Sequence, residues 1–135
     1  MEMVMTNESY WAAMEAEKAL LGAILIESAD GNSKTAIRES RRFVSPKDFT
    51  DYAMHDSIRS RFFYAMIYCE NPPHQINLAR QLNSMDLLKA GDIEEMSSLI
   101  ATCPNCFLFE DYAKAVKEYS EQRHGKKAVH IRGAL

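Results

Sequence analysis

Residues 15–25 read EAEKALLGAIL, and this stretch decides the fold class. Its apolar residues recur at spacings of three and four, which is the period of an α-helix with one apolar face. The residues that follow this spacing are Ala16, Leu20, Ala23 and Ile24. We therefore predict a helix over about residues 13–27, with Ser9 or Asn7 as the capping residue at its start.

Five further helices are predicted outward along the chain by the same periodicity. They are expected at about residues 33–43, 52–69, 76–85, 92–101 and 105–124, separated by turn and breaker residues. Ser33 and Asn105 have side chains suited to capping the second and the sixth of these helices. Because no segment alternates apolar and polar residues as a half-buried strand does, the predicted fold class is all-α, a compact bundle of about six helices.

The size and charge of the chain bound its function. Its 135 residues, with a mass of 15.4 kDa, suit one domain and are too few for a motor ATPase or a two-domain enzyme. We expect a flexible N-terminus at residues 1–12, a helical domain at residues 13–124 and a basic tail or linker start at residues 125–135. The net charge of −3 supplies no overall basic field, so direct nucleic-acid binding is disfavoured.

Three observations favour a cytoplasmic protein without a membrane partner. The longest apolar run, residues 19–26, is far shorter than the roughly 20 residues needed to cross a bilayer. The first dozen residues contain no Lys or Arg, so they lack the positive flank of a secretory signal. Three cysteines are an odd number, which favours reduced thiols over a disulfide framework.

No motif in the chain predicts catalysis, a cofactor or a metal. Residues 31–35, GNSKT, lack both glycines that a phosphate-binding loop requires and follow a helix rather than a strand. Cys103 and Cys106 have the spacing of a zinc-binding pair, but no second pair completes four ligands. Packing of these thiols in a loop is favoured; zinc shared between subunits and thiol chemistry remain alternatives. The four histidines are scattered, so we expect no enzyme activity.

Two groups of residues are candidates for contact with a partner. The last predicted helix has aromatic residues on more than one side. They pack either in the domain core or in a self-association seam with a second copy of the chain. The residues of the predicted interface are Phe107, Tyr112, Val116 and Tyr119. The second group is Arg38, Arg41 and Arg42, which form either a solvated face or a contact for an acidic partner or nucleic acid.

Five segments in order along the chain carry a resemblance to a known family. They are residues 15–25; Pro46, Asp48 and Phe49; His55, Ile58, Ala65 and Met66; Ile76 to Leu82 followed by Gly91; and Pro104 followed by Tyr112, Ala113 and Val116. In this order and spacing, about residues 13–123 resemble the N-terminal domain of the bacterial replicative DNA helicase of the DnaB type.

The resemblance implies a small helical bundle whose last helix leads out of the domain. It also implies an assembly role, because the family's domain pairs into the collar of a hexameric ring, holds no nucleotide and helps to recruit the primase. The family's motor domain has no counterpart here, so we expect either a piece of a longer protein or a free-standing relative. The chain departs from the family in a longer, more basic stretch between Ile26 and Ser45, in Asn77 and in the cysteines beside Pro104.

These inferences combine into one expected function. The chain is expected to be a non-enzymatic protein-interaction and oligomerisation domain in DNA replication, which self-associates as a homodimer or larger assembly. Its other expected partners are primase, the helicase or a helicase loader. The alternatives are a free-standing relative that binds nucleic acid or regulates the helicase, and a cysteine-based metal or redox module.

Overall fold

The structure is a computed structural model that describes residues 6–31 and 33–125. The described part is all-helical and contains no strand, which confirms the predicted fold class. Its α-helices are α1 (Asn7–Asp30), α2 (Thr35–Ser40), α3 (Arg59–Tyr68), α4 (Gln75–Ser84), α5 (Asp92–Thr102) and α6 (Phe109–Arg123). Two short 3₁₀ helices, η1 (Pro46–Asp48) and η2 (Cys106–Leu108), complete the set. The predicted basic tail lies outside the described residues, except for Gly125.

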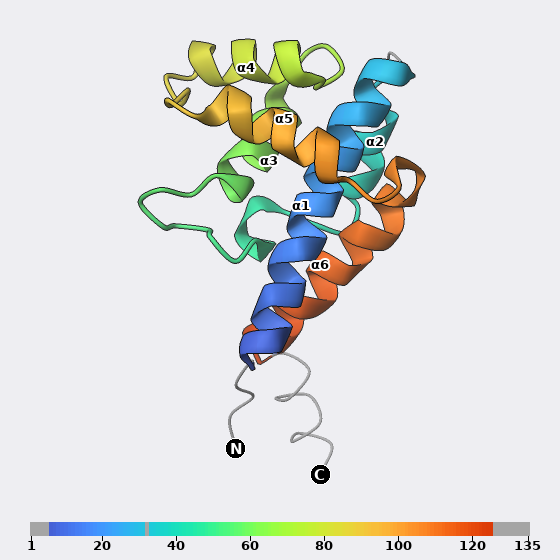
Figure 1. The fold of residues 1–135 in the computed structure, drawn as a ribbon, viewed down its shortest axis with the longest axis vertical. Helices are drawn as coiled ribbons and strands as arrows, with labels where there is room; N and C mark the ends of the chain where they lie inside the picture. The colour runs from blue at the N-terminus through green and yellow to red at the C-terminus, as the bar shows by residue number, and fades with distance from the viewer. Residues whose placement is uncertain (1–5, 32, 126–135) are drawn as a thin grey trace.

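Figure 1 shows two helix pairs that meet along the upper half of α1. The first pair, α1 and α6, runs antiparallel down the length of the molecule. The other pair, α4 and α5, lies across the upper end, away from the chain termini. Helix α3 lies below α4, and α2 packs on both α1 and α6. The core between these layers is formed by Leu20, Leu21, Ile24, Phe49, Phe62, Phe63, Met66, Leu78, Leu82, Met96, Leu99 and Val116.

Helix α1 begins earlier than the apolar pattern predicts. Its N-cap is Thr6, whose side-chain oxygen accepts the backbone N–H of Ser9, so neither Asn7 nor Ser9 caps the helix. Residues 7–12, assigned from sequence to a flexible N-terminus, are therefore helical. The pattern failed here because the first two turns face solvent in part, and an exposed turn carries no apolar period.

Helix α3 begins later than predicted, since residues 52–58 form turns. The carboxylate of Asp51 accepts the backbone N–H groups of Ile58, Arg59 and Ser60 at 2.8–3.0 Å. These are the donors that the first turn of a helix leaves without partners, so Asp51 fixes the start of α3 from outside the helix. Ala53 has a φ of 67°, which a helix does not allow, so α3 cannot extend back through residue 53.

The other helices lie close to their predicted positions. Helices α4 and α5 agree with prediction to within one residue at each end, whereas α2 is shorter than the predicted 33–43. Asn105 accepts the N–H of Phe107 as a cap, but the turn it caps is η2, and α6 starts at Phe109. No helix in the described residues is long and apolar enough to span a bilayer.

Gly22 determines how closely α1 approaches α5. A Cβ atom at this position would collide with the backbone carbonyl oxygen of Leu99 on α5. The two helices therefore pack backbone against backbone at this point, which only glycine allows. The same contact brings Cys103, at the end of α5, onto α1.

Candidate interaction surfaces

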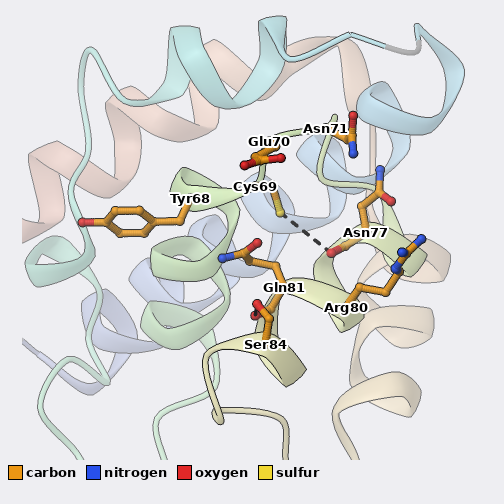
Figure 2. A pocket seen from close by; sticks show the side chains of 8 residues that line it. All are labelled: Tyr68, Cys69, Glu70, Asn71, Asn77, Arg80, Gln81 and Ser84. Atoms are coloured by element: carbon orange, nitrogen blue, oxygen red, sulfur yellow. Dashed lines mark hydrogen bonds between the residues drawn. The ribbon is translucent and has the colours of Figure 1, made fainter.

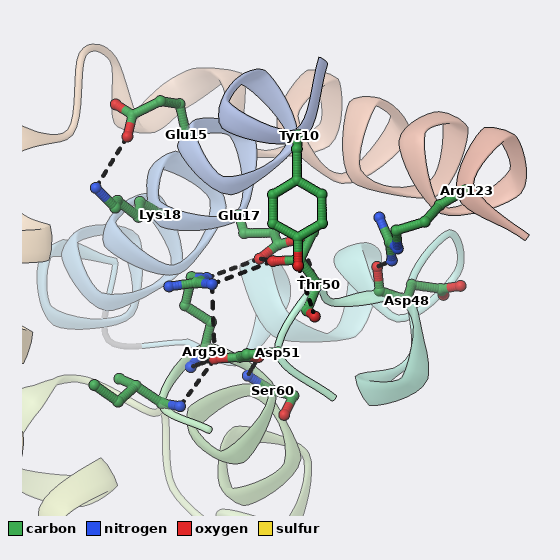
Figure 3. Close-up of polar contacts among 11 residues, drawn as sticks. Tyr10, Glu15, Glu17, Lys18, Asp48, Thr50, Asp51, Arg59, Ser60 and Arg123 are labelled. Atoms are coloured by element: carbon green, nitrogen blue, oxygen red, sulfur yellow. Dashed lines mark hydrogen bonds and ion pairs between the residues drawn. The ribbon is translucent and has the colours of Figure 1, made fainter. Parts of the chain in front are cut away.

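A buried polar cluster holds the segment before α3 against α1 (Figure 3). The carboxylate of Glu17, 1% exposed, accepts the backbone N–H and the hydroxyl of Thr50, both at 2.8 Å. It also pairs with Arg59, whose Nε lies 2.7 Å from Glu17 Oε1. Burial raises the pKa of Glu17 even though Arg59 and Thr50 act to lower it. The hydroxyl of Tyr10 donates to the carbonyl oxygen of Thr50, so two turns of α1 fix this segment.

A second polar cluster joins η1 to α6. Asp48 accepts hydrogen bonds from the Ser45 backbone N–H at 2.8 Å and from the Ser120 hydroxyl at 2.7 Å, and lies 3.5 Å from Lys117 Nζ. Arg123 donates to the Asp48 backbone carbonyl at 2.7 Å. Burial acts to raise the pKa of Asp48, but these hydrogen bonds and the Lys117 charge bring it below its ordinary value. The carboxylate is therefore a fixed anion that anchors α6.

A third cluster is the buried ion pair between α3 and the start of α5. Arg61 donates two hydrogen bonds to the carboxylate of Asp92, at 2.6 and 2.8 Å, and a further one to the carbonyl oxygen of Leu87. Both side chains are buried. Burial acts to raise the pKa of Asp92, but hydrogen bonds from Arg61 and Lys89 bring it below its ordinary value. All three clusters hold backbone segments in place, although Arg123 Nη1 in the second is buried without a hydrogen-bond partner.

The start of α6 is the first candidate surface. Phe107 is 73% exposed and Leu108 is 41% exposed, and both lie in η2, which packs on α1. Along α6, Tyr112 and Tyr119 are half-buried. Val116 is only 1% exposed and belongs to the core, so its side chain has no surface for a second chain. Of the four residues predicted to form an interface, Phe107, Tyr112 and Tyr119 thus have exposed side-chain surface and Val116 does not, while Leu108, which was not predicted, is exposed.

The second candidate surface lies where α2 meets α6. Arg38, Arg41 and Arg42 are all exposed there, as the charge run indicated. Phe43 follows them, with the Arg42 guanidinium 5.9 Å and Lys114 Nζ 5.3 Å from its ring centroid. Sequence reasoning missed Lys114 because its distance from the arginines along the chain gave no signal of their proximity.

The cysteines before α6 pack against α1. The Sγ atom of Cys103 lies 3.7 Å from the carbonyl oxygen of Ala19, and that of Cys106 lies 3.7 Å from Glu27 Oε2. Burial raises the pKa of both thiols, and the Glu27 carboxylate raises that of Cys106 further. In the described part of the chain, no three His, Cys, Asp or Glu side chains are grouped to hold a metal ion. The geometry favours packing by these thiols.

The two hollows of largest volume among those found in the described residues differ in polarity. One, of ≈ 460 Å³, lies between the end of α3 and α4 and is lined mainly by polar side chains, including Tyr68, Asn77 and Arg80 (Figure 2). Burial raises the pKa of Cys69, at its floor, to about 11, so this thiol stays protonated. The other, of ≈ 680 Å³, lies among α1, α4 and α5 and is mainly apolar. Its one histidine, His74, accepts the Asn77 N–H and caps α4.

The fold is that of a helicase-associated helical domain. A family described as the DnaB-like helicase N-terminal domain matches residues 11–118, so the chain belongs to this family, as the resemblance indicated. Among solved structures, the N-terminal domain of DnaB helicase from Mycobacterium tuberculosis is similar, with a TM-score of 0.66 and 24% identity. The match covers 86% of this chain and 78% of that one. A comparison with individual curated proteins finds no match.

Proposed function

We propose that this chain is a non-catalytic protein-interaction and oligomerisation domain that acts in DNA replication. It associates with a second copy through the exposed start of α6 and docks a primase, a helicase or a helicase loader. In this proposal the protein works in the cytoplasm beside the replication machinery. Membership of the DnaB-like family supports a role in replication.

One observation carries the proposed self-association. Phe107 and Leu108 expose apolar surface side by side on a short 3₁₀ turn whose position is fixed by the Asn105 cap. A large exposed aromatic side chain beside a second apolar one costs solvation free energy unless a partner covers it. Aromatic residues are enriched at the centres of protein interfaces.

The test is a matched pair of substitutions. Leu108→Asp places a charge in the proposed contact, whereas Leu88→Asp makes the same change at a leucine of equal exposure, 40% against 41%, between α4 and α5. We expect Leu108→Asp to weaken association by about 2 kcal/mol, roughly thirtyfold, and Leu88→Asp to leave it unchanged. Light scattering over a concentration series measures both. An unchanged mass for Leu108→Asp, or an equal loss in the control, refutes the proposed seam.

A second substitution probes the length of the seam. Tyr119→Asp, three turns further along α6, should also weaken association by about 2 kcal/mol with little loss of helix content by circular dichroism. If only Leu108→Asp weakens association, the contact between copies is confined to the start of the helix.

The docking partner is tested by titration against the full-length replicative helicase and, separately, the primase of the same organism. Light scattering at physiological salt follows the complex mass. Binding to primase supports a helicase-collar role, and binding to helicase supports a loader or regulator. If neither protein binds while the chain itself forms a homodimer, the docking half of the proposal is wrong.

A further inference from the structure

The chain concentrates positive charge in one short segment. Residues 34–47 contain five cations and a single acid, Glu39, in a chain whose net charge is −3. The five are Lys34, Arg38, Arg41, Arg42 and Lys47. All five are exposed; four lie on α2 or directly beside it, and Lys47 lies in η1. The rest of the chain therefore carries a net charge of −7, obtained by subtracting the +4 of this segment from −3.

Tertiary packing adds a cation from α6 to this segment. Lys114 reaches the ring of Phe43 at 5.3 Å, while Arg42 lies 5.9 Å from the same ring centroid. The ring face attracts each cation, but the two positive charges repel each other. An anion placed beside them would relieve that repulsion.

Few of these cations are paired within the domain. Arg42 pairs with Glu39 at 2.9 Å, and Arg38 donates to the hydroxyl of Thr35. In residues 6–31 and 33–125, Arg41, Lys47 and Lys114 take part in no ion pair within 4.0 Å. Their charges are accordingly open to a partner from outside.

We propose that this α2–α6 basic patch, formed by Arg38, Arg41, Arg42, Lys47 and Lys114, binds a short acidic segment of a partner protein. A segment with Asp or Glu side chains complements the patch in charge and is short enough to remain on it.

A nucleic acid fits the same patch less well. The ring of Phe43 is half-buried and packed against the core, so it offers no open face on which a base could stack.

The test measures binding of a fluorescein-labelled peptide of alternating Asp and Ser by fluorescence polarisation. Arg41→Glu and Lys114→Glu reverse one charge each on two different elements of the patch. Arg80→Glu, at an exposed arginine on α4 outside the patch, is the matched control for the change in net charge. Circular dichroism verifies that each variant keeps its helix content.

We expect each patch variant to bind the peptide roughly tenfold more weakly, with the control within about twofold of the parent protein. Binding should also weaken as salt is added. No measurable binding by the parent protein, or equal losses in all three variants, overturns the proposal. Tighter binding of an oligodeoxythymidylate with the same variant sensitivity overturns the assignment of the occupant. Leu108→Asp should keep peptide binding, which separates this surface from the proposed self-association seam.

Discussion

The charged groups around α3 differ from those around α2 in how their charges are matched. On the α3 side, Glu17 pairs with Arg59, and Arg61 pairs with Asp92, with donor–acceptor distances of 2.6–2.8 Å. On the α2 side, cations outnumber acids, and Arg41 has no ion pair within the described residues. In the first set Glu17, Arg61 and Asp92 are buried and Arg59 is only partly exposed, whereas the cations of the second set are exposed to water.

The difference follows from solvation. A buried charge without a partner costs several kcal/mol, so the fold must match every charge that it encloses. An exposed charge keeps its water and needs no partner for the domain to be stable. Charges that the fold has matched hold backbone in place, and charges that it has left unmatched are available for binding. The predictions below test this division, starting with the largest effect.

Breaking the buried pair should cost the most. Arg61→Leu leaves the Asp92 carboxylate enclosed without its main partner, and we expect a loss of about 3–5 kcal/mol in the free energy of unfolding. Urea denaturation followed by circular dichroism measures it. Replacing both residues with leucine should recover a large part of the loss, because no unpaired charge remains. A loss for Arg61→Leu of under about 1 kcal/mol would contradict the structural role of the pair.

The fixed anion of η1 should show a pH dependence. The pKa of Asp48 in the folded state is below its ordinary value of 3.8, so the folded protein holds fewer protons on this group than the unfolded chain does. Its contribution is present above that ordinary value and is lost as pH falls through the lower, folded-state pKa. Asp48→Asn should cost about 1–3 kcal/mol at neutral pH, and its difference from the parent protein should shrink on acidification.

Urea denaturation at a series of pH values measures this effect. Asp111→Asn, at an exposed acid in the first turn of α6, controls for the loss of one negative charge. A stability difference for Asp48→Asn that stays constant down to acid pH would mean that the Asp48 carboxylate does not anchor α6 as an ion.

The smallest effect on stability belongs to the α2 surface. Glu39→Gln removes the exposed pair with Arg42 and should change the free energy of unfolding by no more than about 0.5 kcal/mol. The same change makes the patch more positive, so the acidic peptide should bind about twofold more tightly. Denaturation and fluorescence polarisation measure the two quantities on one sample. A large loss of stability with unchanged binding would reverse the division between the two regions.

Local sequence patterns predicted the helices whose limits depend on local residues. The prolines near residue 72 and Gly91 mark the starts of α4 and α5, because a backbone without a donor or with a positive φ cannot belong to the helix before it. The start of α3 was missed because it depends on where the Asp51 carboxylate lies after the chain has turned. Helical periodicity shows that a residue lies on a face, not whether that face is covered.

For the same reason, helical periodicity could not show which candidate surface residues are exposed. Tyr112, Val116 and Tyr119 share one side of α6 in the sequence pattern, yet Val116 is enclosed and the tyrosines are half-buried. The exposure of Leu108 and the approach of Lys114 to Phe43 had no sequence signal at all, because each depends on an element that is distant along the chain.

The sequence by itself determined the all-α class, the family and the position of the basic segment. Helical period, ordered motifs and local charge depend only on the order of residues along the chain. The tertiary structure decided which of those charges are matched and which apolar residues stay exposed. Burial and pairing are contacts between distant segments, and the free energy of removing a group from water depends on what surrounds it once the helices have packed.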